Sequence, residues 1–383
     1  MSNGLERGFR RGKGIKFILV LKHLFVDRAV IDAPQTLLFQ DKLNLPVQIV
    51  DEGREVFDFV SKADDPIQRG KEVLFLTRNK GAFIRKCPGT RHYTCCDYMI
   101  LHIGTFCTMD CAYCILQSYF HPPVLQFFVN HSDLFHELNT ALAEKRFRRI
   151  GTGEFTDSLI WEVWTGFNAD LVNRFARQSH AMLELKTKTT AVAGLKDLDH
   201  RKKTAIAWSV NTDSVIQTNE RGTAPLSARL KAAARCESWG YPLAFHFDPM
   251  VIYTGCEADY RGVIEDIFQH VSPENVLWIS IGTFRFMPDL KPIVQARFPV
   301  SKIIYGEFVS GMDDKMRYFK PLRIELYRAM YAAVQDISPK VPVYFCMEDD
   351  EVWQKSFGFL PSDAGGLAAM LDRSAVHHCG LDR

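Results

Sequence analysis

From about residue 97 onward, strand-like runs of β-branched and aromatic residues alternate with amphipathic runs of helical period. Repeated units of strand and then helix are typical of parallel strands joined by helical crossovers. The repetition therefore predicts an α/β fold, in the form of a partial (β/α)6 barrel of TIM type. The six expected strands cover residues 98–104, 148–154, 181–188, 204–211, 241–248 and 275–283.

The chain of 383 residues has room for this barrel and an appendage. Short β-rich runs predict a small N-terminal α/β region over residues 1–90, which ends in a turn-rich segment. The barrel is expected over residues 91–340, and a C-terminal strand with a helical extension over residues 341–383. The net charge is only +2, and neither a membrane-spanning apolar run nor an apolar signal region is evident. We therefore expect a cytoplasmic protein without a membrane partner.

Three cysteines, Cys107, Cys111 and Cys114, follow the first expected barrel strand with the spacing C-x3-C-x2-C. Three thiolates from one short loop can hold three irons of a four-iron cluster and leave the fourth iron without a protein ligand. A cluster with four cysteines transfers electrons, whereas an open iron can bind another molecule. Ligands of parallel α/β folds bind where the strands end. The loop therefore predicts a [4Fe-4S] cluster at the mouth of the barrel.

Zinc is the main alternative for these cysteines. A structural zinc site needs a fourth ligand, which Cys95 or Cys96 could supply. The uneven spread of the cysteines argues against disulfides and for a reducing compartment. Whether Cys87, Cys95 and Cys96 bind a second metal or act as small apolar residues stays open at this point.

The cysteine spacing, with the aromatic Tyr113 before the last cysteine, resembles the signature of radical S-adenosylmethionine enzymes. In that class the open iron chelates S-adenosylmethionine, and electron transfer cleaves it to a 5′-deoxyadenosyl radical. The resemblance implies a barrel of the radical S-adenosylmethionine type and an electron donor such as flavodoxin or ferredoxin.

Polar side chains stand at the ends of the other expected strands, where this cofactor would bind. Its ribose and ammonium need hydrogen bonds, and its carboxylate needs a cation. We expect Glu154 at the ammonium, Lys188 at the carboxylate, and Ser209 and Asn211 at the ribose, while Thr156 adds a polar group to the rim. Each of these could instead make a rim hydrogen bond that touches no ligand.

Two further groups of residues stand out. His246 and Asp248 are two residues apart on one strand, hence on one face, and form a possible acid–base pair. A basic cluster near an aromatic residue is expected either to contact DNA phosphates or to form ion pairs at a helix start. Its members are Arg285, Lys315, Arg317, Lys320 and Arg323.

Four short segments resemble the spore photoproduct lyase family, and the resemblance runs from about residue 70 to the C-terminus. They are Cys87-Pro-Gly-Thr90, Cys95-Cys-Asp-Tyr98, Leu116-Gln117 and Gly222-Thr223. The resemblance implies a cluster, S-adenosylmethionine at Lys188 and Ser209, and direct reversal of a thymine dimer in DNA. In this family the adenosyl radical takes hydrogen from the lesion, the methylene bridge breaks, and a cysteine returns a hydrogen atom.

The chain departs from the family pattern at two positions. The donor cysteine is expected near Glu154, yet no cysteine lies between Cys114 and Cys236. The tyrosine expected after the third cluster cysteine is Ile115. We therefore assign catalytic roles to Tyr113, which matches the family, and to Cys346 as a substitute donor at the end of a late strand.

These departures leave three functions open. The first is a lyase that repairs a pyrimidine photoproduct in DNA. The second is a radical enzyme that modifies a peptide or small molecule. The third is a non-catalytic, metal-stabilised nucleic-acid-binding protein.

Overall fold

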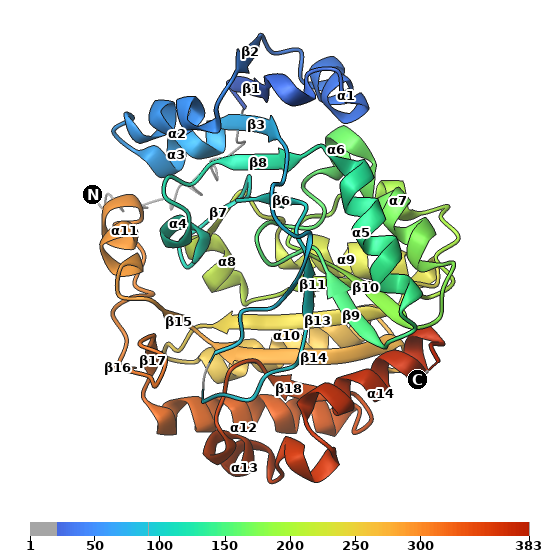
Figure 1. The fold of residues 1–383 in the computed structure, drawn as a ribbon. Coiled ribbons are helices and arrows are strands. Elements are labelled where there is room, and N and C mark those ends of the chain that lie inside the picture. The colour runs from blue at the N-terminus through green and yellow to red at the C-terminus, as the bar shows by residue number, and fades with distance from the viewer. Residues whose placement is uncertain (1–20, 91, 383) are drawn as a thin grey trace, which may run out of the picture.

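The computed structural model describes residues 21–90 and 92–382 (Figure 1). Its largest sheet has eight strands in the order β18-β14-β13-β11-β10-β9-β5-β4. Neighbours from β5 to β18 run parallel, and the edge strand β4 pairs antiparallel with β5. The bounds are Ile84–Lys86 (β4), Met99–Leu101 (β5), Arg148–Gly151 (β9), Ala181–Thr187 (β10), Thr204–Ser209 (β11), Leu243–Met250 (β13), Val276–Thr283 (β14) and Val343–Phe345 (β18).

This sheet curls into a half-barrel, and each of the six predicted strands overlaps one of its strands. The α/β fold is therefore confirmed. Strand β18 adds a seventh parallel strand from the segment that we assigned to the C-terminal extension. Helices on the outer side complete the crossovers, namely α5 (His131–Ala143), α7 (Phe167–Phe175), α9 (Leu226–Ser238), α10 (Cys256–His270) and α12 (Lys320–Ile337).

The strand sequences explain why the barrel strands are buried on both faces. All eight residues of β14 are buried, and the run Val276–Ile281 is almost continuously apolar. Such runs are typical of parallel strands that are covered by helices on one side and by the barrel interior on the other. Trp208 and Trp278 are at most 2% exposed and fill the space between layers.

A second sheet precedes the barrel and has the order β2-β1-β3-β8-β6. Its first three strands are β1 (His23–Asp27), β2 (Val47–Val50) and β3 (Val73–Thr77), with helices α1 (Pro34–Leu43), α2 (Gly53–Ser61) and α3 (Pro66–Glu72) between them. The strands β6 (Gly104–Thr105) and β8 (Leu125–Phe128) come from beyond residue 90. The cysteine loop connects β6 to β8 of this second sheet, and its side chains line the cavity at the ends of the barrel strands.

The chain ends with the helices α13 (Asp350–Phe357) and α14 (Leu367–Cys379). Asp372 of α14 pairs with Arg149 of β9 at 2.8 Å, and Lys203 donates to the carbonyl of Cys379 at 3.0 Å. Both contacts fasten α14 to the strands of the half-barrel. Among the helices described in the structure, none is long and apolar enough to cross a membrane.

Candidate active site

A cavity of about 310 Å³ opens where the barrel strands end. The cysteine loop forms one wall of this cavity, and the ends of β9, β10, β11 and β13 form another. A third side comes from the small sheet of β15 (Arg285–Phe286), β16 (Phe308–Ser310) and β17 (Met316–Tyr318). The polar and sulfur-bearing lining comprises Cys107, Met109, Cys111, Tyr113, Cys114, Glu154, Thr156, Asp157, Lys186, Thr187, Lys188, Ser209, Asp248, Arg285, Lys315 and Met347.

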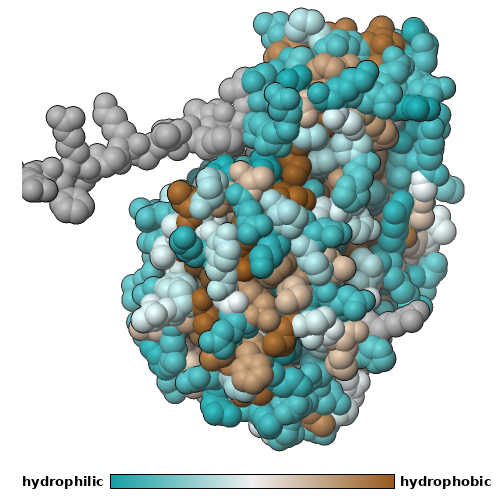
Figure 2. All heavy atoms as spheres, turned by 90° about the vertical axis from the view of Figure 1, so that its left-hand side faces the viewer, coloured by the Kyte–Doolittle hydropathy of each residue, from teal (hydrophilic) through white to brown (hydrophobic). Residues whose placement is uncertain are grey.

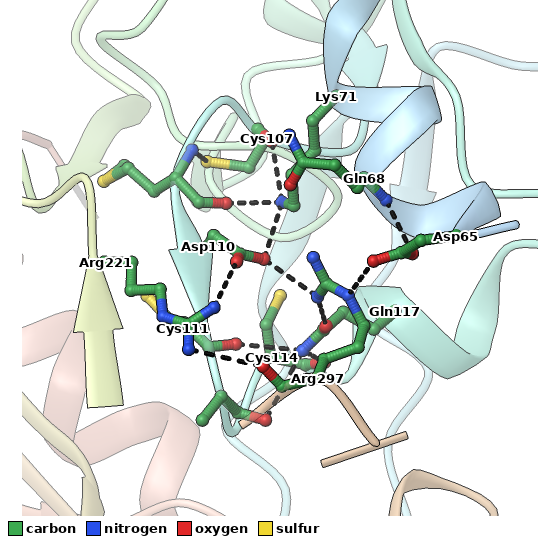
Figure 3. Close-up of polar contacts among 12 residues, drawn as sticks. Asp65, Gln68, Lys71, Cys107, Asp110, Cys111, Cys114, Gln117, Arg221 and Arg297 are labelled. Atoms are coloured by element: carbon green, nitrogen blue, oxygen red, sulfur yellow. Dashed lines mark hydrogen bonds and ion pairs between the residues drawn. The ribbon is translucent and has the colours of Figure 1, made fainter. Parts of the chain in front are cut away.

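A network of buried charges holds the cysteine loop in place (Figure 3). Lys71, which is 1% exposed, donates to the carbonyls of Cys107 and Met109. The buried carboxylate of Asp110 lies 3.8 Å from the Lys71 ammonium and 2.9 Å from the Arg297 guanidinium. Lys71 and Arg297 therefore bind the backbone of the loop and the Asp110 carboxylate. The side chains of the three cysteines take no part in this network and line the cavity.

The three thiols suit a cluster. Burial raises the pKa of Cys107 to about 12 and the pKa of Cys111 well above its ordinary value. Ligation to a metal requires deprotonation, and the nearby Lys71 and Lys188 cations favour the thiolates. In residues 21–90 and 92–382, no three His, Cys, Asp or Glu side chains are placed to hold a single metal ion.

Four of the five predicted cofactor residues line this cavity, namely Glu154, Thr156, Lys188 and Ser209. Lys188 follows β10 and lies 5.7 Å from the centre of the Tyr113 ring, without a hydrogen-bond partner for its ammonium among the described residues. Thr156 has a buried hydroxyl that also lacks a partner. Ser209 ends β11 and lines the same space. Buried polar groups are normally paired, so the free hydroxyl of Thr156, in the same cavity as the Lys188 ammonium, indicates a ligand-binding site.

Asn211 does not belong to this set. Its side chain is 1% exposed, donates to the carbonyl of Pro249 at 2.8 Å and accepts from the Tyr260 hydroxyl at 2.7 Å. The amide also accepts from the backbone N–H of Thr212. The expected ribose contact at Asn211 is therefore wrong, because the amide stabilises the loop after β11 instead.

A buried ion pair, which the sequence did not reveal, connects the elements on the cofactor side of the cavity to one another. The Glu220 carboxylate pairs with Arg229 and accepts from the Tyr113 hydroxyl. Arg229 also donates to the carbonyl of Ser209 at 2.8 Å. Strand β12 (Glu220–Arg221) pairs in turn with β7 (Asp110–Cys111) in the cysteine loop. One ion pair thus fixes Tyr113, the loop and the end of β11 relative to one another.

The side of the cavity away from the cysteine loop carries charged side chains, among them Asp248 and Arg285. Asp248 forms two hydrogen bonds with Arg285, at 3.2 and 3.0 Å. His246 pairs with Glu184 at 3.0 Å rather than with Asp248, so the expected acid–base pair does not form. Glu184 also accepts from the Tyr98 hydroxyl at 2.6 Å. Gly151 permits this contact, because a Cβ atom there would lie 1.7 Å from the Tyr98 oxygen.

Glu154 and Lys186 lie on this charged side. Glu154 raises the pKa of Lys186, and it also acts on the thiols of Cys87 and Cys346. Glu154 is not among the groups that shift the pKa of Cys107 or Cys111, whereas the Lys188 cation lowers the pKa of Cys111. Lys186 was missed in the sequence, although alternation along β10 places it on the same face as Lys188.

Cys346 follows β18 and is half-buried near the charged side of the cavity. Burial raises its pKa to about 11, with the Arg285 cation opposing this shift. The segment that carries Cys87, Cys95 and Cys96 packs against the turn after Cys346, since the Thr94 N–H donates to the carbonyl of Glu348 at 3.1 Å.

We expect Cys95 to be the first cysteine to react with iodoacetamide at pH 7.5. It is exposed, and interaction with the neighbouring Cys96 lowers its pKa to about 6, so it is largely thiolate at this pH. Mass spectrometry of the cluster-loaded protein after brief alkylation measures the order of reaction. Prior modification of Cys87 or Cys346 would contradict the assignment.

The basic cluster is mostly occupied by ion pairs. Arg317 and Arg323 are 2% and 4% exposed and pair with Asp313 and Glu348. The expected phosphate contacts of these two arginines are therefore wrong. Lys320 pairs with Asp349 and Glu351 on the surface. Arg285 and Lys315 line the cavity, each paired with an aspartate.

The half-barrel carries three cysteine thiols on the loop after its first strand, beside polar groups at the strand ends, as the sequence predicted for a radical S-adenosylmethionine enzyme. The family model for spore photoproduct lyase matches residues 91–336. The chain therefore belongs to the spore photoproduct lyase family.

Curated relatives agree with this membership. The spore photoproduct lyase of Bacillus subtilis is 27% identical over 234 residues, which cover 60% of this chain and 66% of the relative. The spore photoproduct lyase of Clostridium acetobutylicum is 24% identical over 255 residues, which cover 66% of this chain and 71% of the relative. The chain thus spans about two thirds of the length of these relatives.

Solved structures of spore photoproduct lyase share the fold. A cysteine-to-alanine variant matches with a TM-score of 0.76 at 19% identity, and the match covers 85% of this chain and 99% of that chain. A double mutant with bound AdoMet and dinucleoside spore photoproduct matches with a TM-score of 0.74 at 19% identity and the same coverage.

Proposed function

We propose that this protein is a radical S-adenosylmethionine lyase that reverses a dimeric pyrimidine photoproduct in DNA. The observation that carries the proposal is one cavity that joins the cysteine loop to unpaired polar groups on the strand ends. Family membership supports the reaction class, and a relative binds dinucleoside spore photoproduct.

In this proposal Cys107, Cys111 and Cys114 hold a [4Fe-4S] cluster. When bound there, such a cluster would supply an electron for the reductive cleavage of S-adenosylmethionine. Lys188 binds the methionyl carboxylate, while the hydroxyls of Ser209 and Thr156 donate to the rest of the cofactor. Tyr113 is held by Glu220 and forms the wall between the cofactor and the loop. A flavodoxin or ferredoxin is the proposed electron donor.

The surface around the cavity supports a macromolecular substrate. Lys315 lies in the connection between β16 and β17 and lines the cavity, while Val309 and Met312 of the same hairpin are 46% and 56% exposed. The hairpin thus presents apolar side chains beside the opening. Figure 2 shows hydrophobic residues gathered on this side of the molecule. Exposed apolar residues beside an opening are suited to contact an unstacked base.

Cys346 is the proposed hydrogen donor. Its S–H bond breaks as a new C–H bond forms on the product radical, which leaves the unpaired electron on sulfur. A donor of this kind must be a thiol, and its pKa of about 11 keeps it protonated at neutral pH. Besides burial, the charged groups that act on its pKa are Arg285, Asp248, Glu154 and Lys186.

We expect Cys346→Ala to cleave the photoproduct but to lose solvent-derived hydrogen from its product. Thiol protons exchange with water, so the wild-type enzyme in D2O should place one deuterium in the repaired thymine methyl group. Mass spectrometry of the product measures this label, and Cys256→Ala serves as a control on a helix outside the cavity. Labelling should stay constant from pH 6 to pH 9 and fall as the pH rises through about 11.

Two results would contradict the proposal, each in a different part. Unchanged labelling in Cys346→Ala would exclude Cys346 as the donor. A loaded enzyme that cleaves S-adenosylmethionine but leaves spore photoproduct DNA intact would exclude repair of this lesion. The charged groups that line the cavity would then favour radical modification of a small molecule.

A further inference from the structure

Lys186 and Lys188 point to different halves of the cavity. Both leave β10 on the same face and both line the cavity, and the described residues provide no hydrogen bond or ion pair for either ammonium. Lys188 faces Tyr113 and the cysteine loop. Lys186 lies among the carboxylates of Glu154, Glu184 and Asp248, which raise its pKa. Lys186 is therefore a protonated donor on the side opposite the cofactor contacts.

Of the three carboxylates around Lys186, two are already occupied. Glu184 is bound by His246 and Tyr98, and Asp248 is bound by Arg285. The Glu154 carboxylate has no hydrogen-bond donor in the part of the chain that the structure describes, and it lines the cavity. Glu154 and Lys186 do not close on each other as an ion pair within 4.0 Å. One free acceptor and one free donor thus line the same cavity, and the Lys186 side chain packs against Gly153, the residue before Glu154.

The Lys186 ammonium and the Glu154 carboxylate together restrict which chemical groups can bind between them. A formal anion would be attracted by Lys186 and repelled by Glu154, and a cation would meet the reverse. A neutral group that carries a carbonyl beside an N–H satisfies both side chains. A trans peptide bond directs its C=O and N–H to opposite sides, so one such pair cannot hold both. A cyclic imide keeps C=O and N–H on one edge.

We propose that Lys186 and Glu154 form a donor–acceptor pair that reads the C(=O)–N–H imide edge of a pyrimidine base. Lys186 donates to the carbonyl oxygen, and Glu154 accepts from the imide N–H. The inference rests on the proposed function in placing a pyrimidine in this cavity. It assigns Glu154 to the substrate rather than to the ammonium of S-adenosylmethionine, which agrees with its position beside Cys87 and Cys346.

Two nucleosides that differ by one methyl group test this assignment. The probes are 5,6-dihydrothymidine and its N3-methyl derivative, titrated by calorimetry into the cluster-loaded protein with S-adenosylmethionine and without reductant. The wild-type protein should bind the N–H compound at least about tenfold tighter, because a hydrogen bond to a charged group is lost on methylation. In Glu154→Met this ratio should fall to about one.

Two further variants separate recognition from structure. Lys186→Met should weaken both probes to a similar extent and leave their ratio unchanged, because it removes the carbonyl contact alone. Lys196→Met, at an exposed position, should match the wild type. A ratio near one in the wild type, no binding of dihydrothymidine, or an unchanged ratio in Glu154→Met would overturn the inference. Failure to repair the photoproduct with the ratio intact would instead overturn the proposed function.

Discussion

Replacing Cys111 with alanine should abolish the formation of 5′-deoxyadenosine, a fall on the order of 10³-fold or more, because residues that act as a unit fail together. Loss of one thiolate leaves two ligands for a cluster that needs three from this loop. Cys111 is 7% exposed, and its backbone pairs with Glu220 in the β7–β12 ladder. Alanine preserves that ladder, so we expect the cluster to be lost while the fold is retained.

Iron content, circular dichroism and product formation measure these effects together. Cys236→Ala is the matched control, because Cys236 is fully buried in α9 and does not line the cavity. It should retain the iron content of the wild type. If Cys111→Ala instead unfolded the chain, the metal would have a structural rather than a chemical role.

Replacing Asp110 with alanine should destabilise the protein by about 3–5 kcal/mol, the usual cost of breaking a buried ion pair. The side chain is 0% exposed and lies within 4 Å of Lys71, Arg221 and Arg297. Its removal leaves the buried Lys71 ammonium without a carboxylate. Because these residues also hold the cysteine loop, we expect the variant to lose iron more readily.

Urea unfolding of the two proteins measures the change in the free energy of unfolding. The control is Asp58→Ala on α2, where Asp58 forms an exposed pair with Arg54 at 3.7 Å. Surface pairs of this kind contribute about 0–1 kcal/mol. Equal small effects at Asp110 and Asp58 would show that the charge network does not secure the loop.

Local patterns were sufficient to predict the strands of the half-barrel and the position of the cysteine loop at their ends. The strands follow from apolar runs such as Val276–Ile281, and the three cysteines lie within eight residues of one another. Lys188 and Ser209 could be placed because each comes at the end of a predicted strand. Such features depend on neighbours in sequence, and therefore the sequence alone reveals them.

Partners that are distant in sequence could not be predicted in the same way. His246 of β13 pairs with Glu184 of β10, on the other side of β11, and Tyr113 pairs with Glu220 of β12. These contacts depend on strand register, which no local pattern specifies. The burial of Arg317 depends on Asp313, which is close in sequence but is brought near it by the β16–β17 turn.

The most direct test of the central claim is the formation of 5′-deoxyadenosine by the anaerobically reconstituted protein. Cluster-loaded enzyme is mixed with S-adenosylmethionine, dithionite and dinucleoside spore photoproduct, and the products are quantified by liquid chromatography and mass spectrometry. We expect 5′-deoxyadenosine, methionine and repaired thymidine from the wild-type protein, and none of them from Cys111→Ala. A fully loaded protein that leaves S-adenosylmethionine intact would contradict it.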